Sequence, residues 1–247
     1  MVRLTFLGTG AGNFRGSRRQ PSSAYVEGLL LDCGAGATGR LHDVQAFDRV
    51  DAVLISHLHS DHVAGLFDFL LHTLITGRRR PLTLLSPPGL SAILASVFAA
   101  KGTVVDPSEL YDFRVIESER PEVTVGRWRI RGVPLDHSIL NLGYALESDG
   151  VSLFYTGDTR EPSATHDMTA DYLIHEATYA DRHRALARDF GHSTASQAAE
   201  AARATKARRL FLTHVGDLPG SDTEISEEAR RGFPESIVVE DRSSFEL

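Results

Sequence analysis

One short segment holds most of the residues whose types and spacing could bind metal ions. Positions 56–62 read Ser-His-Leu-His-Ser-Asp-His, directly after an apolar run and directly before a helical pattern. In an extended segment side chains alternate, so His57 and His59 point the same way and can bind one ion. Asp61 and His62 lie where the chain turns into the helix, and they can bind a second ion about 3.5–4 Å from the first. The segment therefore predicts a site for two metal ions.

Three further donor residues lie elsewhere in the chain. His137, Asp158 and His214 each lie at the end of an apolar run that is typical of a strand. The two oxygens of a carboxylate can bind two ions at once, whereas one imidazole serves only one ion. We therefore expect the strand ends to bring these residues to the same site, with Asp158 able to bridge the two ions.

The positioning elements are short strands that alternate with helices. Helical patterns cover residues 62–77, 87–100 and 195–204. Two-residue turns in the first half predict antiparallel hairpins, whereas strand and helix alternate around Ser56 and again from Leu153 to Thr213, which predicts parallel pairs. The chain shows no repeat and no linker-like stretch. We therefore expect one domain over residues 1–247, with mixed sheets between helices.

The composition excludes several classes of protein. The 247 residues are 42% hydrophobic and 24% charged, which is typical of a soluble globular protein and not of collagen-like, disordered or disulfide-rich chains. Cys33 is the single cysteine, and no apolar run approaches the ~18 residues that cross a membrane. We expect a cytoplasmic protein without a membrane partner. The net charge of −7 argues against bulk coating of nucleic acid, although a local basic patch could still bind one phosphodiester.

Two arginine clusters could form such a patch. Arg78, Arg79 and Arg80 close a helical pattern, where cations complement the helix dipole, so we expect a structural role there. Arg15, Arg18 and Arg19 lie in the first long loop and are candidates for contact with substrate.

Several motifs together resemble the metallo-β-lactamase superfamily, and within it most closely ribonuclease Z and related phosphodiesterases. Besides the histidine segment they are Phe6–Gly10, Leu31–Gly34, Thr156–Thr159, His175–Thr178 and Gly191–Thr194. The last two are the most specific, and the resemblance spans nearly the whole chain. It implies an α/β fold, a four-layer αββα sandwich with mixed sheets, and two divalent metal ions. Donors of nitrogen and oxygen suit Zn²⁺, and also Mn²⁺ or Fe²⁺.

The resemblance also implies which residues bind which ion. One ion would be bound by His57, His59, His137 and Asp158, and the other by Asp61, His62, His214 and the same Asp158. Cys33 is not a ligand in this scheme. The neighbouring Asp32 is expected to orient one of the histidines from outside the ligand set.

The implied chemistry is phosphodiester hydrolysis of a small diester or of RNA. In the reaction that the resemblance implies, a hydroxide held by the two ions would attack phosphorus, and His192 would protonate the leaving oxygen. Glu176 would hold and charge the imidazole of His192, and Asp61 would accept a hydrogen bond from the attacking water. The family also suggests a homodimer.

Other functions stay open at this point. A tRNA 3′-processing endonuclease is one, but ribonuclease Z carries a long insertion with a tRNA-gripping arm between the positions matching His137 and Asp158, and only twenty residues lie there in this chain. A lactonase or sulfatase of the same superfamily is another, and a non-catalytic, metal-stabilised binding module is a third. A serine hydrolase with Ser193 as nucleophile is disfavoured, because no apolar strand precedes that serine.

Overall fold

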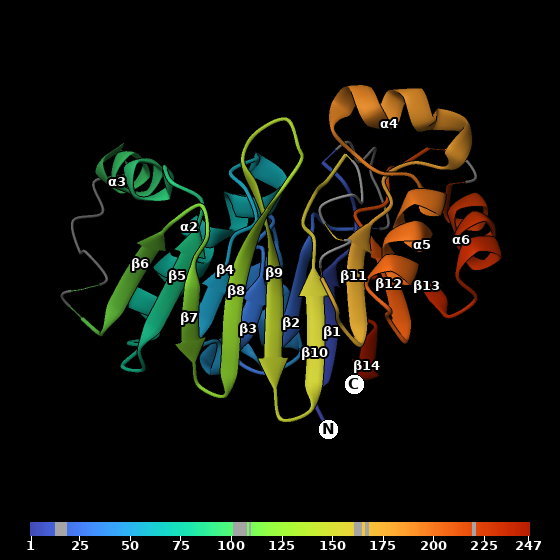
Figure 1. Ribbon diagram of the computed structural model, residues 1–247. Helices are drawn as coiled ribbons and strands as arrows, with labels where there is room; N and C mark the ends of the chain where they lie inside the picture. The colour runs from blue at the N-terminus through green and yellow to red at the C-terminus, as the bar shows by residue number, and fades with distance from the viewer. Residues whose placement is uncertain (13–18, 101–107, 109, 161–164, 166–167, 219–220) are drawn as a thin grey trace.

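Two seven-stranded sheets face each other in the middle of the molecule (Figure 1). The computed structural model describes residues 1–12, 19–100, 108, 110–160, 165, 168–218 and 221–247. The first sheet has the order β14 (Ser244–Glu246), β1 (Arg3–Gly8), β2 (Ser23–Val26), β3 (Leu29–Leu31), β4 (Ala52–Leu54), β5 (Leu82–Ser86), β6 (Phe113–Glu117). The second has the order β13 (Ser236–Val238), β12 (Arg209–Thr213), β11 (Tyr172–Glu176), β10 (Val151–Tyr155), β9 (Asn141–Ser148), β8 (Trp128–Leu135), β7 (Glu122–Val125).

Both sheets are mixed, as the sequence predicts. In the first, β14, β1, β2 and β3 pair antiparallel, and β3 to β6 pair parallel. In the second, β7 to β10 pair antiparallel, and β10 to β13 pair parallel. Short turns join β2 to β3 and the successive strands from β7 to β10, whereas the parallel strands need longer crossovers. Most metal-binding candidates follow strands with a parallel neighbour (β4, β10 and β12), whereas His137 follows β8 in the antiparallel part of the second sheet.

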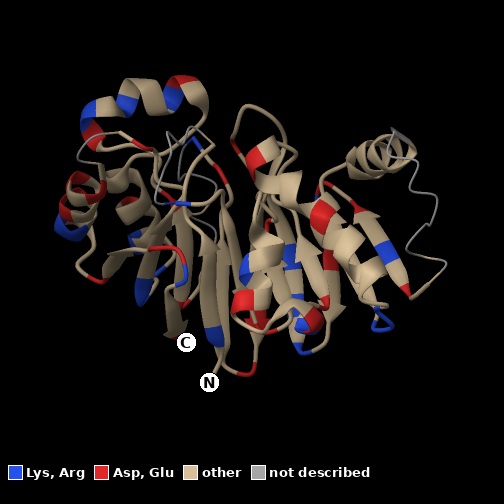
Figure 2. Ribbon diagram, turned by 180° about the vertical axis from the view of Figure 1, so that it is seen from behind, with Lys and Arg blue, Asp and Glu red and all other residues tan. Residues whose placement is uncertain are grey.

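Helices cover the outer faces of the two sheets. They are α1 (Ala37–Asp43), α2 (Ser60–Ile75), α3 (Leu90–Ala100), α5 (Ala195–Ala204) and α6 (Ser221–Gly232), with 3₁₀ turns at Phe47–Arg49 and Asp181–His183. Helix α4 (Arg184–Phe190) instead lies across the ends of the strands (Figure 1). Seen from behind, most charged residues lie on these helices and on the loops, and few lie in the strands (Figure 2). Among the described residues, no helix is long and apolar enough to span a membrane.

Three hydrophobic cores separate the four layers. The core between the sheets is built from side chains such as Phe6, Leu31, Trp128, Tyr144 and Phe211. A second core, which includes Leu30, Val53, Leu66 and Phe69, packs the first sheet against α1 and α2. A third, which includes Leu173, Leu212, Ala198 and Ile225, packs the second sheet against α5 and α6. The predicted four-layer αββα sandwich is therefore confirmed.

The predicted helices are found close to their expected bounds, and three further helices were not predicted. Residues 62–77 correspond to α2, 87–100 to α3 and 195–204 to α5. The sequence did not indicate α1, α4 or α6. Helix α6 buries only Ser221, Ile225 and Ala229, so its apolar stripe is too sparse to stand out.

Helix α2 approaches the loop after β3 so closely that one position must be glycine. A Cβ at Gly65 would lie 2.1 Å from the carbonyl oxygen of Gly34, and the Gly65 amide donates to the Cys33 carbonyl at 2.9 Å. The close approach brings the first turn of α2, with Asp61 and His62, against the residue Asp32 that precedes this loop.

We predict that Gly65→Ala lowers the free energy of unfolding by about 1–3 kcal/mol, because the added methyl group has no room. Urea unfolding of the two proteins measures the difference. Gly39→Ala is the matched control, since Gly39 lies in α1 with open space around its Cβ position. That change should be neutral or stabilising by about 0.5–1 kcal/mol. Equal effects of the two substitutions would contradict the packing argument.

Candidate metal centre

The seven predicted ligand residues converge at one edge of the two sheets. His57 and His59 follow β4, Asp61 and His62 lie in the first turn of α2, and His137, Asp158 and His214 follow β8, β10 and β12. The sequence prediction that strand ends bring these residues together is consistent with this placement. They form two groups of side chains around Asp158.

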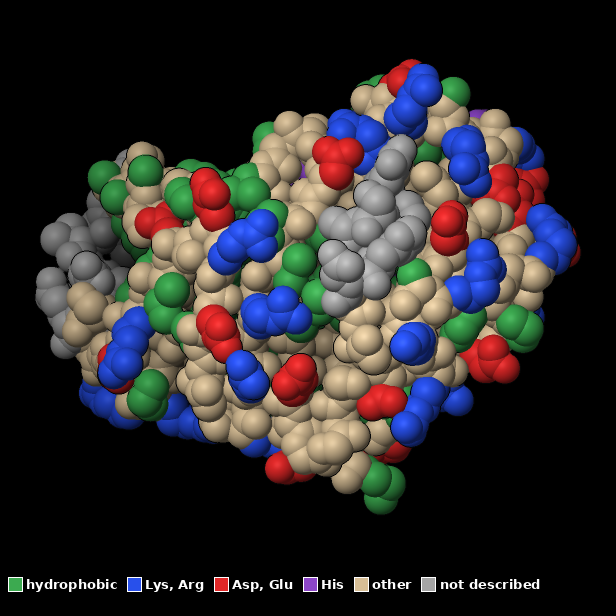
Figure 3. Space-filling view, in the orientation of Figure 1, with side chains coloured by type: hydrophobic (Ala, Val, Ile, Leu, Met, Phe, Trp, Pro, Cys, Tyr) green, Lys and Arg blue, Asp and Glu red, His purple; other side chains and the backbone are tan. Residues whose placement is uncertain are grey.

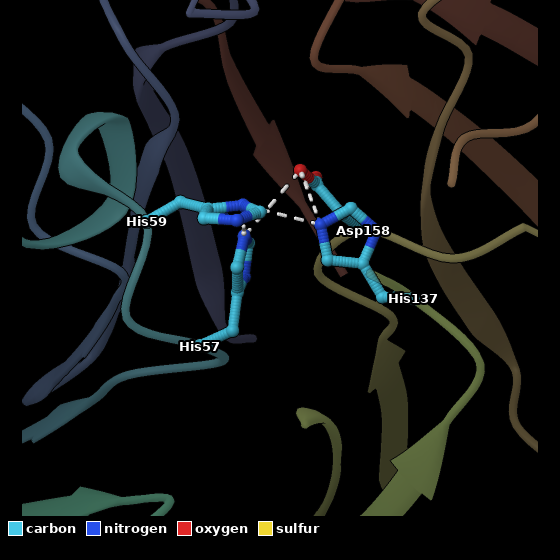
Figure 4. Close-up of side chains that lie close together, drawn as sticks. All are labelled: His57, His59, His137 and Asp158. Carbon is cyan, nitrogen blue, oxygen red and sulfur yellow. Dashed lines mark hydrogen bonds and ion pairs between the residues drawn. The ribbon is translucent and has the colours of Figure 1, made fainter. Parts of the chain in front are cut away.

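The first group contains His57, His59, His137 and Asp158 (Figure 4). His59 Nδ1 lies 2.9 Å from His57 Nε2 and 3.2 Å from His137 Nε2. Asp158 Oδ2 lies 3.6 Å from His57 Nε2 and 4.0 Å from His137 Nε2. One potential ligand atom of each residue thus lies within 4.8 Å of those of the others.

The second group contains Asp61, His62 and His214. The Nε2 atoms of His62 and His214 are 3.2 Å apart, and Asp61 Oδ2 lies 3.3 Å from His214 Nε2. The same Asp158 oxygen lies 3.3 Å from His62 Nε2 and 3.4 Å from His214 Nε2. Asp158 therefore stands between the two groups.

The buried carboxylate of Asp32 orients two of the histidines. Its Oδ2 accepts from His62 Nδ1 at 2.6 Å and from the hydroxyl of Ser56 at 2.7 Å. Because the Ser56 hydroxyl proton is engaged there, Ser56 Oγ acts as acceptor toward His57 Nδ1 at 3.0 Å. Both imidazoles are therefore held by Nδ1 and direct Nε2 toward Asp158.

Two other histidines are held in the same way. His137 Nδ1 donates to the carbonyl oxygen of Gly191 at 2.7 Å. The hydroxyl of Thr178 donates to Glu176 Oε2 at 2.7 Å, so its oxygen accepts from His214 Nδ1 at 2.9 Å. In both residues Nε2 faces the centre. Hydrogen bonds of this kind fix the tautomer of metal-binding histidines.

These contacts fit a pair of metal cations. Lone pairs of several nitrogens point at one another and at a carboxylate, and Asp158 Oδ1 is buried without a hydrogen-bond partner among the described residues. Burial lowers the pKa of His57, His59 and His137, which favours the neutral form that binds metal. Burial also lowers the pKa of His62, but the charges of Asp158 and Asp32 outweigh burial, and the pKa is raised overall. A metal ion that binds His62 Nε2 must therefore displace a proton.

The backbone beside the ligands is constrained. His214 adopts φ 54°, a left-handed conformation that is uncommon for a residue with a side chain. Gly157, which precedes Asp158, has φ 57°, and a Cβ there would lie 2.6 Å from the Ser56 Cβ. The two segments that carry His57 and Asp158 therefore pack at a separation that only glycine allows.

Next to the metal-binding groups, Glu176 and His192 form a buried pair. His192 Nδ1 lies 3.0 Å from Glu176 Oε1, and the backbone amide of Thr159 donates to the same oxygen at 2.8 Å. Burial lowers the pKa of His192, but Glu176 outweighs this effect and raises it to about 9. Burial raises the pKa of Glu176, but His192 holds it below its ordinary value. The pair is therefore an imidazolium held by a carboxylate.

A pocket of about 320 Å³ opens onto this cluster. It is lined by Ala11, Gly12, His59, Asp61, Asp158, Thr178, Tyr179, Phe190, His192 and His214. Burial raises the pKa of Asp61, but its hydrogen bond with His214 and the charge of His62 outweigh burial, and the pKa is lowered overall. This carboxylate therefore stays ionised at the pocket wall.

Several residues singled out in the sequence lie outside the centre. The Ser193 hydroxyl is buried and donates to the Thr159 carbonyl at 2.6 Å, so it is not placed as a nucleophile. His175 Nδ1 donates to the carbonyl of Glu176 at 2.7 Å. The guanidinium of Arg78 donates to the carbonyls of Val50 and Pro81, as expected of a structural role.

Of the three arginines in the first loop, the described one is engaged by other residues of the protein. Arg19 donates to Thr9 Oγ1 at 2.6 Å and to the Val239 carbonyl at 2.5 Å, and it pairs with Asp222. Arg15 and Arg18 lie outside the described residues. Figure 3 shows basic and acidic side chains interspersed over one face, with several basic side chains around α4.

Comparisons with known proteins agree with this geometry. A family model described as a β-lactamase superfamily domain matches residues 28–215. The chain belongs to the β-lactamase superfamily. Within the superfamily it is 32% identical to ribonuclease Z of Salinibacter ruber, over 89% of this chain and 85% of that protein. It is 28% identical to ribonuclease Z of Archaeoglobus fulgidus, over 100% of this chain and 98% of that protein.

A solved superfamily member has the same fold over nearly the whole chain. The short form of human tRNase Z superposes with a TM-score of 0.81 and 25% identity, covering 99% of this chain and 98% of that one. The predicted resemblance to ribonuclease Z is confirmed, and with it the class of metal-dependent phosphodiester hydrolases and a site for two divalent ions.

We predict that Asp158→Ala removes bound metal and activity together. Loss of this carboxylate removes a proposed ligand of both ions and leaves Asp61 as the only carboxylate in the two groups, so both ions bind more weakly. Inductively coupled plasma mass spectrometry of the purified proteins measures metal per chain, and bis(p-nitrophenyl) phosphate reports activity. Full activity with one equivalent of bound metal would contradict the bridging position.

Proposed function

We propose that this protein hydrolyses phosphodiesters at a centre of two divalent ions. One ion is bound by His57, His59, His137 and Asp158, and the other by Asp61, His62, His214 and the same Asp158. The observation that carries the proposal is the set of hydrogen bonds to Nδ1, which turns the Nε2 atoms of four histidines toward Asp158.

The bound ions would supply Lewis acidity, which lowers the pKa of a water molecule and offsets the charge of the phosphate oxygens. We propose Zn²⁺ as the physiological ion, because imidazole is the main donor of the site, while Mn²⁺ and Fe²⁺ suit the same donors.

His192 is placed to donate a proton to the leaving oxygen. Its Nδ1 is held by Glu176, and its imidazole lines the pocket beside Asp158, with Nδ1 3.8 Å from Asp158 Oδ2. Glu176 keeps the imidazole protonated and oriented, which a general acid requires. Asp61, ionised at the pocket wall, accepts a hydrogen bond from the attacking water.

The substrate is a small diester or RNA that does not need a long gripping arm. The alignment with the Archaeoglobus fulgidus ribonuclease Z spans 306 positions against the 247 residues of this chain, a difference of 59. Residues 138–157, all described, form only a short turn and the strands β9 and β10. We therefore place the chain among phosphodiesterases similar to ribonuclease Z, with tRNA 3′ processing as the second candidate, since the relatives carry that enzyme's name.

The site gives less support to a lactonase, a sulfatase or a non-catalytic binding module. In a lactonase or a sulfatase, the buried Glu176–His192 pair would have no specific function. A binding module would have no use for a proton donor at the pocket wall.

We also propose that residues 1–247 act as one domain, because strands from both halves share the core between the sheets. The free and buried Cys33 supports the expected cytoplasmic location. The homodimer stays a prediction.

We predict that His192→Ala lowers kcat on a diester by about 10²–10⁴-fold while metal per chain stays unchanged. Glu176→Gln should lower it by a smaller factor, because the imidazole keeps its place and loses the charge that keeps it protonated. Steady-state kinetics and metal analysis are measured on the same samples. His72→Ala is the control, since His72 lies half-exposed in the last turn of α2. Unchanged kcat in His192→Ala would remove this residue from the mechanism.

The substrate proposal is tested with metal-loaded protein and two substrates. We expect hydrolysis of bis(p-nitrophenyl) phosphate, and little cleavage of a precursor tRNA with a 3′ trailer. Efficient cleavage of the precursor at the discriminator base would instead establish tRNA processing without an arm. Inactivity on both substrates would contradict the proposed function.

A further inference from the structure

The mouth of the metal pocket carries an aromatic side chain that neither binds metal nor belongs to a hydrophobic core. Phe190 is the last residue of α4, is 60% exposed, and lines the pocket together with His192. The other residues around it in the pocket are mostly imidazoles and carboxylates. An exposed phenyl ring beside such groups leaves an apolar face uncovered.

The backbone holds Phe190 at a defined place relative to the reacting groups. The amide of His192 donates to the Ala187 carbonyl at 2.8 Å, and Gly191 adopts φ 83°, so α4 ends in a tight left-handed turn. The carbonyl of Gly191 accepts from His137 Nδ1. Phe190 therefore directly precedes Gly191, which holds His137, and lies two residues before His192, the proposed proton donor.

A second apolar segment lies beside the same turn. Ile139 and Leu140, which follow His137, are 41% and 36% exposed. A Cβ at Gly191 would lie 3.1 Å from the amide nitrogen of Ser138, so this segment packs directly against the end of α4. Ile139 and Leu140 do not line the pocket themselves, but they extend the apolar surface next to it. The pocket thus combines a polar floor that suits a phosphate with the exposed ring of Phe190, which suits a flat, uncharged group.

We propose that Phe190 stacks on the nucleobase of the leaving nucleoside, and that the substrates are nucleotide diesters. The inference rests on the proposed function, because it places the leaving group next to His192. Every base offers a π-face, so an exposed aromatic ring binds a base without reading its sequence. An alkyl or sugar substituent offers no such face. Phe190 is thus a specificity-determining residue that contacts substrate and takes no part in proton transfer.

The test compares a diribonucleotide of adenosine with two analogues that each lack one of the two bases. Product chromatography shows which nucleoside leaves. For metal-loaded wild-type protein we expect loss of the leaving-side base to lower kcat/KM by about tenfold, and loss of the other base to have a smaller effect. In Phe190→Ala, loss of the leaving-side base should no longer lower kcat/KM. Phe190→Trp, which keeps an aromatic face, should retain the difference.

Leu186→Ala is the matched control, because Leu186 is an exposed apolar residue of the same helix that does not line the pocket. It should behave as the wild type. The inference is overturned if the wild type is indifferent to the leaving-side base, or if Phe190→Ala keeps the wild-type difference. If the wild type hydrolyses neither the diribonucleotide nor bis(p-nitrophenyl) phosphate, the proposed function itself fails.

Discussion

The arrangement of the metal centre depends on the hydrogen bonds that the carboxylate of Asp32 accepts. This carboxylate is fully buried, and it accepts hydrogen bonds from the Ser56 amide, the Ser56 hydroxyl, the Tyr155 hydroxyl and His62 Nδ1 at 2.5–2.7 Å. A buried charge with this many donors is well compensated, and breaking the set would leave it with a large desolvation cost. Tyr155 comes from the second sheet and the other donors come from the first half of the chain, so this one carboxylate joins both sheets at the site.

His137 and His214 are also held by a hydrogen bond at Nδ1, but their acceptors are neutral. The Gly191 carbonyl holds His137, and Thr178, itself held by Glu176, supports His214. Glu176 thus has two tasks, because its Oε1 pairs with His192 and its Oε2 accepts from Thr178. The groups proposed for proton transfer and the groups proposed for metal binding therefore share one hydrogen-bonded network, and their positions are fixed together.

The sequence predicted that the metal-binding candidates would lie close together, because they are near one another in the chain or lie at strand ends. His57 to His62 occupy one segment, and Asp158 and His214 close apolar strands whose ends meet at one edge. It also predicted that Asp32 would orient a histidine, without identifying His62. The supports of His137 and His214 could not be predicted, since a backbone carbonyl and a threonine hydroxyl carry no distinctive pattern. Phe190 was missed for a similar reason, because only its place at the end of α4 separates it from a core residue.

The central claim is that two cations bind on either side of Asp158, and crystals of the zinc-loaded protein test it most directly. Anomalous diffraction at the zinc edge should show two peaks about 3.5–4 Å apart, one among His57, His59 and His137 and the other among Asp61, His62 and His214. Both peaks should lie within bonding distance of the Asp158 carboxylate. A single peak, or two peaks of which one is not coordinated by Asp158, would contradict the account.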